Sequence, residues 1–140
     1  MLQPKRVKHR KMHRARGDKS GVAHTGATVV YGEMALKAME CGEISARQIE
    51  SARIAINRTV RRGGKTWIRI FPDRVLTMKA AQVPMGSGKG APDKWVAQVH
   101  TGKVLFEMSG ATPEMMKTAL TRARFKLPIS CSIVSKDTLY

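Results

Sequence analysis

The 140-residue chain carries 26 Lys and Arg side chains against 10 Asp and Glu, which gives a formal net charge of +16. Such an excess argues against a charge-balanced globular domain and favours a polyanionic partner: nucleic acid first, and an anionic membrane surface second. No apolar run is long enough to span a membrane, and Cys41 and Cys131 show no metal-binding or disulfide spacing.

Residues 1–26 are expected to form a basic arm, followed by a single domain over residues 27–140. Asp18 is the only acid in residues 1–20, and large apolar residues are few, so the arm is expected to become ordered only on RNA. No metal site is predicted, because His9 and His13 lack cysteine or carboxylate neighbours. The candidate RNA-binding residues of the arm are Lys5, Arg6, Lys8, His9, Arg10, Lys11, His13, Arg14 and Arg16.

Two elements and one ambiguous segment follow the arm. Residues 27–31 (ATVVY) are expected to form the first strand. Residues 33–40 (EMALKAME) favour a helix by propensity, although the flanking glycines leave an extended conformation open. The clearest helix covers residues 44–62, where Ser45 and Gln48 complete a capping box. Its narrow apolar stripe is formed by Ile49, Ala52, Ile56 and Val60.

The polar surface of this helix is dominated by arginine. Glu50 is the only acid between Ala46 and Arg62, so a phosphate-facing surface is favoured over an ordinary solvated face. Guanidinium groups also match the geometry of phosphate oxygens better than ammonium groups do. The candidate RNA-binding residues of the helix are Arg47, Arg53, Arg58, Arg61 and Arg62.

The C-terminal half predicts strands around a second helix. Residues 66–71 alternate as a strand, and residues 95–99 and 104–108 are expected to pair as a hairpin. A second helix over residues 113–126, capped by Thr112, precedes a last strand that contains Ile129, Cys131 and Ile133. The pattern predicts an α+β fold: a two-layer α/β sandwich with two helices on a mixed or antiparallel sheet. Trp67 and Trp95 are interpreted as core residues rather than base-stacking ones.

A long glycine-rich loop, residues 77–93, contains the sequence VPMGSGKGAP. It departs from a nucleotide-binding P-loop, because Val83 stands at the first glycine and Gly90 at the hydroxyl position. A nucleotide-dependent enzyme using residues 86–90 is the weaker alternative, and it requires nucleotide binding that Lys89→Ala abolishes. No pair of acids has a spacing typical of acid–base catalysis. A free-standing RNA or DNA chaperone is a third alternative.

Six stretches follow one another in the order seen in a single family: MLQPKRVKHRKMHR, ISARQIESARIAINR, GGKTWIRIFPD, MGSGKGAPDKWVA, GKVLFEMSG and KLPI. Together they resemble bacterial-type large-subunit ribosomal protein sixteen, a family shared with the archaeal and eukaryotic large-subunit protein ten-e. The resemblance implies a non-catalytic constituent of the large ribosomal subunit that binds large-subunit rRNA beside neighbouring ribosomal proteins. It implies no cofactor, metal, membrane or homo-oligomer, and a location in cytoplasmic bacterial ribosomes or in an organellar matrix or stroma.

The resemblance also assigns the glycine-rich loop to tRNA. It implies contact with A-site tRNA, and with P-site tRNA as a further expectation, near the peptidyl-transferase centre. Residues 33–40 are extended in that family. Pro84 stands where the family usually has an arginine, so the contact made by that arginine is absent here. The tRNA-proximal residues are Met85, Gly86, Ser87, Gly88, Lys89 and Gly90.

Overall fold

The computed structural model describes residues 2–14, 20–61 and 63–136. Its strands form two antiparallel sheets, with the orders β3-β6-β1-β7 and β2-β5-β4. The four-stranded sheet contains β1 (Met34–Ala38), β3 (Lys65–Ile68), β6 (Val104–Ser109) and β7 (Cys131–Ser135). The three-stranded sheet contains β2 (Gly42–Ser45), β4 (Arg74–Met78) and β5 (Ala91–Val99). The helices are α1 (Ala46–Thr59) and α2 (Pro113–Arg124), so the predicted α+β class is confirmed.

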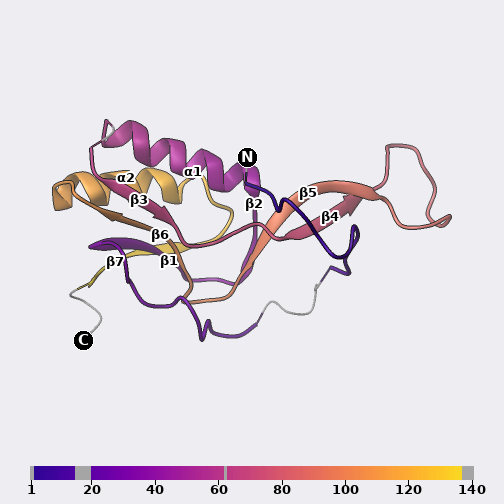
Figure 1. Cartoon of the computed structure of the whole chain (residues 1–140), viewed down its shortest axis with the longest axis horizontal. Coiled ribbons are helices and arrows are strands. Elements are labelled where there is room, and N and C mark those ends of the chain that lie inside the picture. The colour runs from indigo at the N-terminus through magenta and orange to yellow at the C-terminus, as the bar shows by residue number, and fades with distance from the viewer. Residues whose placement is uncertain (1, 15–19, 62, 137–140) are drawn as a thin grey trace.

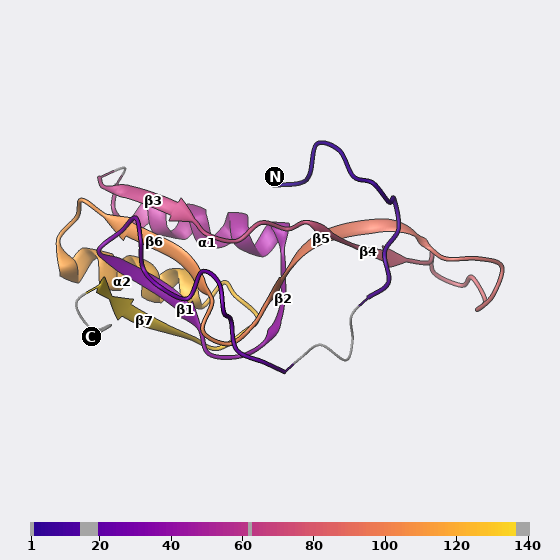
Figure 2. The same ribbon diagram turned by 60° about the horizontal axis from the view of Figure 1, so that its bottom comes forward.

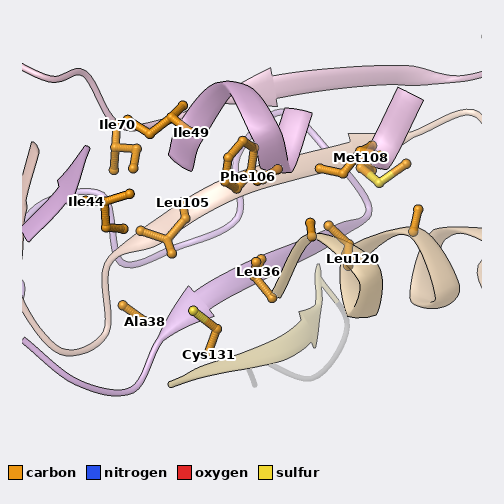
Figure 3. Packing of buried hydrophobic residues seen from close by; sticks show 14 of the residues in the cluster. Leu36, Ala38, Ile44, Ile49, Ile70, Leu105, Phe106, Met108, Leu120 and Cys131 are labelled. Carbon is orange, nitrogen blue, oxygen red and sulfur yellow. The ribbon is translucent and has the colours of Figure 1, made fainter. Parts of the chain in front are cut away.

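Both helices lie on one side of the four-stranded sheet (Figure 1). The buried cluster between these layers includes Leu36 of β1 with Phe106 and Met108 of β6, none of which has exposed surface (Figure 3). Alternation along the strands sends these side chains toward the helices. The apolar stripes of the helices complete the cluster: Ile49, Ala52 and Ile56 from α1, and Met116, Ala119, Leu120 and Ala123 from α2.

The start of α1 is determined by local sequence. The Ser45 hydroxyl accepts a hydrogen bond from the amide of Gln48, and the Gln48 side chain accepts one from the amide of Ser45. The predicted capping box is therefore confirmed, and it satisfies amide groups that the first helical turn leaves without partners. At α2 the position of Thr112 is correct, but its side chain makes no capping hydrogen bond, and the helix ends at Arg124, before the predicted residue 126.

The expected strand at residues 27–31 is wrong, because this segment joins neither sheet. Instead, the Glu107 carboxylate accepts hydrogen bonds from the amides of Val30 at 3.3 Å, Tyr31 at 2.6 Å and Gly32 at 2.8 Å. A side chain thus replaces a partner strand. The segment packs Val29 against the sheet side opposite the helices. Residues 34–38, within the ambiguous segment, are extended as β1.

The expected hairpin of residues 95–99 and 104–108 is also wrong. β5 pairs with β2 and β4, whereas β6 pairs with β1 and β3, so the two strands belong to different sheets. The short connection between them is fixed to β1, because the amide of Gly102 donates to the carbonyl oxygen of Ala38 at 2.7 Å. The expected strand at residues 66–71 is shorter, and ends at Ile68.

β4 and β5 form a hairpin that projects from the rest of the molecule (Figure 2). The glycine-rich loop, residues 79–90, lies at its tip. This loop is shorter than the predicted 77–93, because β4 continues to Met78 and β5 begins at Ala91. The hairpin therefore presents the loop away from the four-stranded sheet and the helices (Figure 2).

Candidate nucleic-acid interface

The arginines of α1 lie on the side of the helix that faces away from the core. Arg47 and Arg58 of α1 are exposed, and Arg53 is partly exposed; Arg61, which lies beyond the end of α1 at Thr59, is also exposed. The guanidinium groups of Arg47, Arg58 and Arg61 make no hydrogen bond or ion pair with any other residue that the structure describes. Their positive charges are therefore available to bind an anionic partner. The predicted Arg62 lies outside the described residues.

Arg53 differs from these arginines because it forms an ion pair with another residue of α1, Glu50. Its guanidinium donates two hydrogen bonds to the Glu50 carboxylate, at 2.5 and 3.1 Å. The Arg53 hydrogen bonds lower the pKa of Glu50 against the opposing effect of burial, which favours the ionised carboxylate. The positive charge of Arg53 is therefore balanced by Glu50, unlike the charges of Arg47 and Arg58.

The end of α2 extends this basic surface. A shallow hollow along α1 is lined by Arg47 and Arg58 together with Lys126, which follows α2. Arg122 of α2 donates a hydrogen bond to the Thr59 hydroxyl at 3.2 Å, which joins the ends of the two helices. Lys126 is not among the RNA-binding residues expected from the sequence. Lys126 lies beside these arginines because α2 packs against α1, which the sequence does not reveal. The basic residues at the end of the second helix, Arg122, Arg124 and Lys126, are nevertheless apparent in the sequence.

Within the arm, the structure describes residues 2–14 and 20–26, and the basic side chains of residues 2–14 are exposed. Leu2 packs against the main core, and Arg14 forms two hydrogen bonds with Glu43 of β2, at 2.7 and 3.2 Å. The exposed candidates are Lys5, Arg6, Lys8, His9, Arg10, Lys11, His13 and Arg14. The predicted Arg16 lies outside the described residues.

The tip of the glycine-rich loop is open to solvent. Met85 is 89% exposed, and Gly86 and Gly88 have positive φ angles of 101° and 96° with no atom near a virtual Cβ. Gly90 differs, because a Cβ there would lie 2.6 Å from the carbonyl oxygen of Met78. Glycine is thus required by backbone conformation at the tip and by close packing at the base.

Three lysines donate hydrogen bonds to carbonyl oxygens at or beside this loop. Lys79 donates hydrogen bonds to the carbonyl oxygens of Pro84, at 3.3 Å, and Gly86, which closes the loop on itself. Lys89 donates to the carbonyl oxygen of Met12, and Lys11 donates to that of Lys89 at 2.9 Å. The arm and the loop, distant in sequence, are therefore in contact. Sequence patterns gave no signal for this contact, because it depends on backbone acceptors.

The loop does not have the geometry of a nucleotide-binding loop. A P-loop joins a strand to a helix whose N-terminus receives the phosphates, whereas this loop joins two antiparallel strands. Within residues 2–14, 20–61 and 63–136, no group of three or more His, Cys, Asp or Glu side chains could hold a metal ion. In the same ranges, no helix has the length and apolar character needed to cross a membrane.

Comparisons with known proteins agree with this arrangement. Residues 4–134 match the family model described as ribosomal protein L16p/L10e. The large ribosomal subunit protein uL16 of Dehalococcoides mccartyi, in strains BAV1 and CBDB1, is 53% identical over 137 residues. The matched region covers 98% of this chain and 91% of each relative. The chain therefore belongs to the ribosomal protein L16p/L10e family.

Proposed function

We propose that the chain binds large-subunit rRNA through its N-terminal arm and through the arginine surface of α1, and so acts as a structural constituent of the large ribosomal subunit. Members of its family are ribosomal proteins, and the chain is not an enzyme. Its relatives are bacterial, and the corresponding location is the cytoplasmic ribosome. Neighbouring ribosomal proteins are the other partners in this proposal.

The observation that carries the proposal is that Arg47, Arg58 and Arg61 have no hydrogen-bond or ion-pair partner among the residues that the structure describes. Exposed cations gathered on one side of a helix repel one another, and a phosphate backbone removes that repulsion while releasing counterions. Lys126 adds a further cation at the same hollow. The binding energy would come from phosphate neutralisation over α1 and the arm, with no need for a closed pocket.

We further propose that the glycine-rich loop contacts tRNA in the A site, with the P site as a second contact. The support is its position at the tip of a projecting hairpin, together with the open backbone at Gly86 and Gly88. A glycine backbone allows close approach to a nucleic-acid surface. Because Pro84 stands in the position that the family usually gives to arginine, the charge for this contact comes from Lys89.

The salt dependence of RNA binding tests the rRNA proposal. The wild-type chain and Arg58→Ala are titrated with a fragment of large-subunit rRNA at several salt concentrations. Loss of one phosphate contact lowers the slope of log affinity against log salt by about 1. Lys117→Ala is the matched control, because Lys117 is an exposed lysine on α2 that does not line the α1 hollow. An unchanged slope in Arg58→Ala contradicts the assignment of α1 to RNA.

A further inference from the structure

An aromatic and cationic cluster lies on the β3 edge of the four-stranded sheet, apart from α1, the arm and the loop. The rings of Tyr31 and Trp67 stack with centroids 6.1 Å apart and planes 22° from parallel. The Lys65 ammonium lies 5.2 Å from the Trp67 ring centroid, and the Arg69 guanidinium carbon lies 5.1 Å from that of Tyr31. Two cations thus flank two stacked rings.

The backbone beneath Tyr31 is held in place. The amides of Tyr31 and Gly32 both donate to the Glu107 carboxylate, which is also paired with Arg69. Arg69 also donates a hydrogen bond of 3.4 Å to the carbonyl oxygen of Thr28, in the segment that leads to Tyr31. A Cβ at residue 32 would lie 2.6 Å from the carbonyl oxygen of Met108, so only glycine permits this close packing.

The Tyr31 ring nevertheless remains at the surface. Tyr31 is 59% exposed, although it stacks on Trp67 and lies beside Arg69. The Glu107 hydrogen bonds and the buried Val29 already attach the segment to the sheet, so attachment does not require an exposed aromatic ring. A fixed and exposed ring beside two cations has the features of a base-stacking surface, since stacking on aromatic side chains is a main mode of single-stranded RNA recognition.

We propose that Tyr31 stacks against an unpaired base of large-subunit rRNA, while the exposed Lys65 neutralises an adjoining phosphate and Arg69, paired with Glu107, supports the Tyr31 ring. The charge of the chain supports an anionic occupant: Glu107 balances Arg69, so the exposed Lys65 and Glu33 remain at this surface, in a chain of net charge +16. This inference rests on the proposed rRNA-binding function and adds a second RNA contact. The new contact is on the sheet side opposite the helices.

Two RNA probes separate stacking from phosphate attraction. Fluorescence anisotropy measures the affinity of the full chain for a short single-stranded oligoadenylate and for the same backbone with abasic sites. Tyr31→Ala is expected to weaken binding of the oligoadenylate by about fivefold or more, with little change for the abasic strand. The salt slope is expected to stay constant, because no phosphate contact is removed. Phe125→Ala is the matched control, as Phe125 is 80% exposed at the end of α2.

Two further variants distinguish stacking from folding. Tyr31→Phe keeps the ring and is expected to bind the oligoadenylate like wild type. Tyr31→Leu keeps an apolar cover over Trp67 but lacks a ring, and it is expected to lose the same affinity as Tyr31→Ala. Thermal melting of each variant confirms that it is folded. The pair Tyr31→Phe and Tyr31→Leu therefore tests the inference even if Tyr31→Ala fails to fold.

Equal binding by wild type and Tyr31→Leu, or equal weakening for both probes, overturns the stacking contact and leaves the α1 surface unaffected. Failure of the wild-type chain to bind either RNA contradicts the proposed function as well as this inference. In assembled large subunits, base-specific chemical probing provides the corresponding measurement. An unpaired rRNA base protected by the wild-type chain is expected to become reactive when Tyr31→Leu is incorporated, and an unchanged pattern counts against the contact.

Discussion

Arg69, which follows β3, and Glu107 of β6 form an ion pair in which the Glu107 side chain has no exposed surface and that of Arg69 is 17% exposed. Burial raises the pKa of Glu107, but hydrogen bonds from the amides of Gly32, Tyr31 and Val30 and from Arg69 outweigh it. The pKa of this carboxyl therefore lies below its usual value. This one carboxylate joins β6, the end of β3 and the segment that leads into β1.

Loss of the Glu107 carboxylate is expected to destabilise the fold strongly. Glu107→Ala leaves the mostly buried Arg69 without its counter-ion and three backbone amides without their acceptor. Breaking a buried pair by removing one partner costs about 3–5 kcal/mol. Urea denaturation measures the change in unfolding free energy. Glu107→Gln retains one acceptor oxygen, so it is expected to lose less, and equal stability of all three proteins would show that the pair has no such role.

The same carboxyl predicts a dependence of stability on pH. Its pKa is lower in the folded chain than in the unfolded chain, so the unfolded state binds more protons between these two values. The stabilisation is therefore complete above the ordinary pKa of 4.5 and is lost as pH falls toward the folded value. Acid titration of the unfolding free energy is expected to show a steeper decline in wild type than in Glu107→Gln. Parallel curves would contradict this.

The two helix starts predict unequal effects of the same substitution. Ser45→Ala removes a capping hydrogen bond that the structure contains, and is expected to cost about 1 kcal/mol of unfolding free energy. Thr112→Ala is the matched control, because Thr112 makes no side-chain capping bond and the loss should stay below about 0.5 kcal/mol. Urea denaturation compares them, and a loss at Thr112 as large as that at Ser45 would contradict the assignment of the caps.

Charge reversal on α1 is expected to weaken incorporation into large subunits. Arg58→Glu places a carboxylate on the surface proposed to face phosphates, and Arg53→Glu also leaves Glu50 without its partner. Quantitative mass spectrometry of purified large subunits measures occupancy against co-expressed wild type. Lys117→Glu changes the net charge equally and serves as the control.

Arg53→Glu has two effects: it reverses a charge on the proposed RNA surface and it leaves Glu50 without its partner. A charge swap between the two positions separates these effects. The double variant Glu50→Arg with Arg53→Glu restores the i,i+3 pair and the net charge. It is expected to regain part of the occupancy that Arg53→Glu loses. Occupancies for Arg53→Glu and Arg58→Glu that match wild type would show that α1 is not an RNA surface.

Lys89 is expected to exchange partners when tRNA binds. In the free chain its ammonium is bound to the carbonyl oxygen of Met12. Lys89→Ala removes the cation proposed to reach tRNA, so it is expected to weaken A-site tRNA binding about tenfold, as for loss of one charged hydrogen bond. Filter binding of aminoacyl-tRNA to variant ribosomes measures this change. Lys94→Ala is the control, because Lys94 lies on β5 outside the loop, and a normal A-site affinity in Lys89→Ala would contradict the proposal.

Sequence reasoning succeeded where the determinants are local. The start of α1 follows from Ser45 and Gln48, three residues apart, and its buried stripe follows from helical periodicity. It failed where the determinants are distant. Residues 95–108 have the pattern of a hairpin, but the pairing of β5 with β2 and β4 is decided by residues far along the chain.

The candidate site also contains features that the sequence predicts and features that it does not. The arginine-rich surface of α1 and the basic arm were visible as charge patterns. The contacts of Glu107 with residues 30–32, and those of Lys89 and Lys11 with backbone carbonyls, depend on main-chain groups that every sequence possesses. No residue pattern distinguishes such partners before the fold brings them together.

Co-sedimentation with large subunits most directly tests the central claim, that the chain is a component of the large ribosomal subunit bound through phosphate contacts. Ribosomes from the source organism are separated on a high-salt sucrose gradient, and the chain is quantified in each fraction. The account predicts stoichiometric recovery with the large subunit and a specific loss for Arg58→Glu, with Lys117→Glu unaffected. Recovery of the wild-type chain exclusively in the ribosome-free fractions would contradict it.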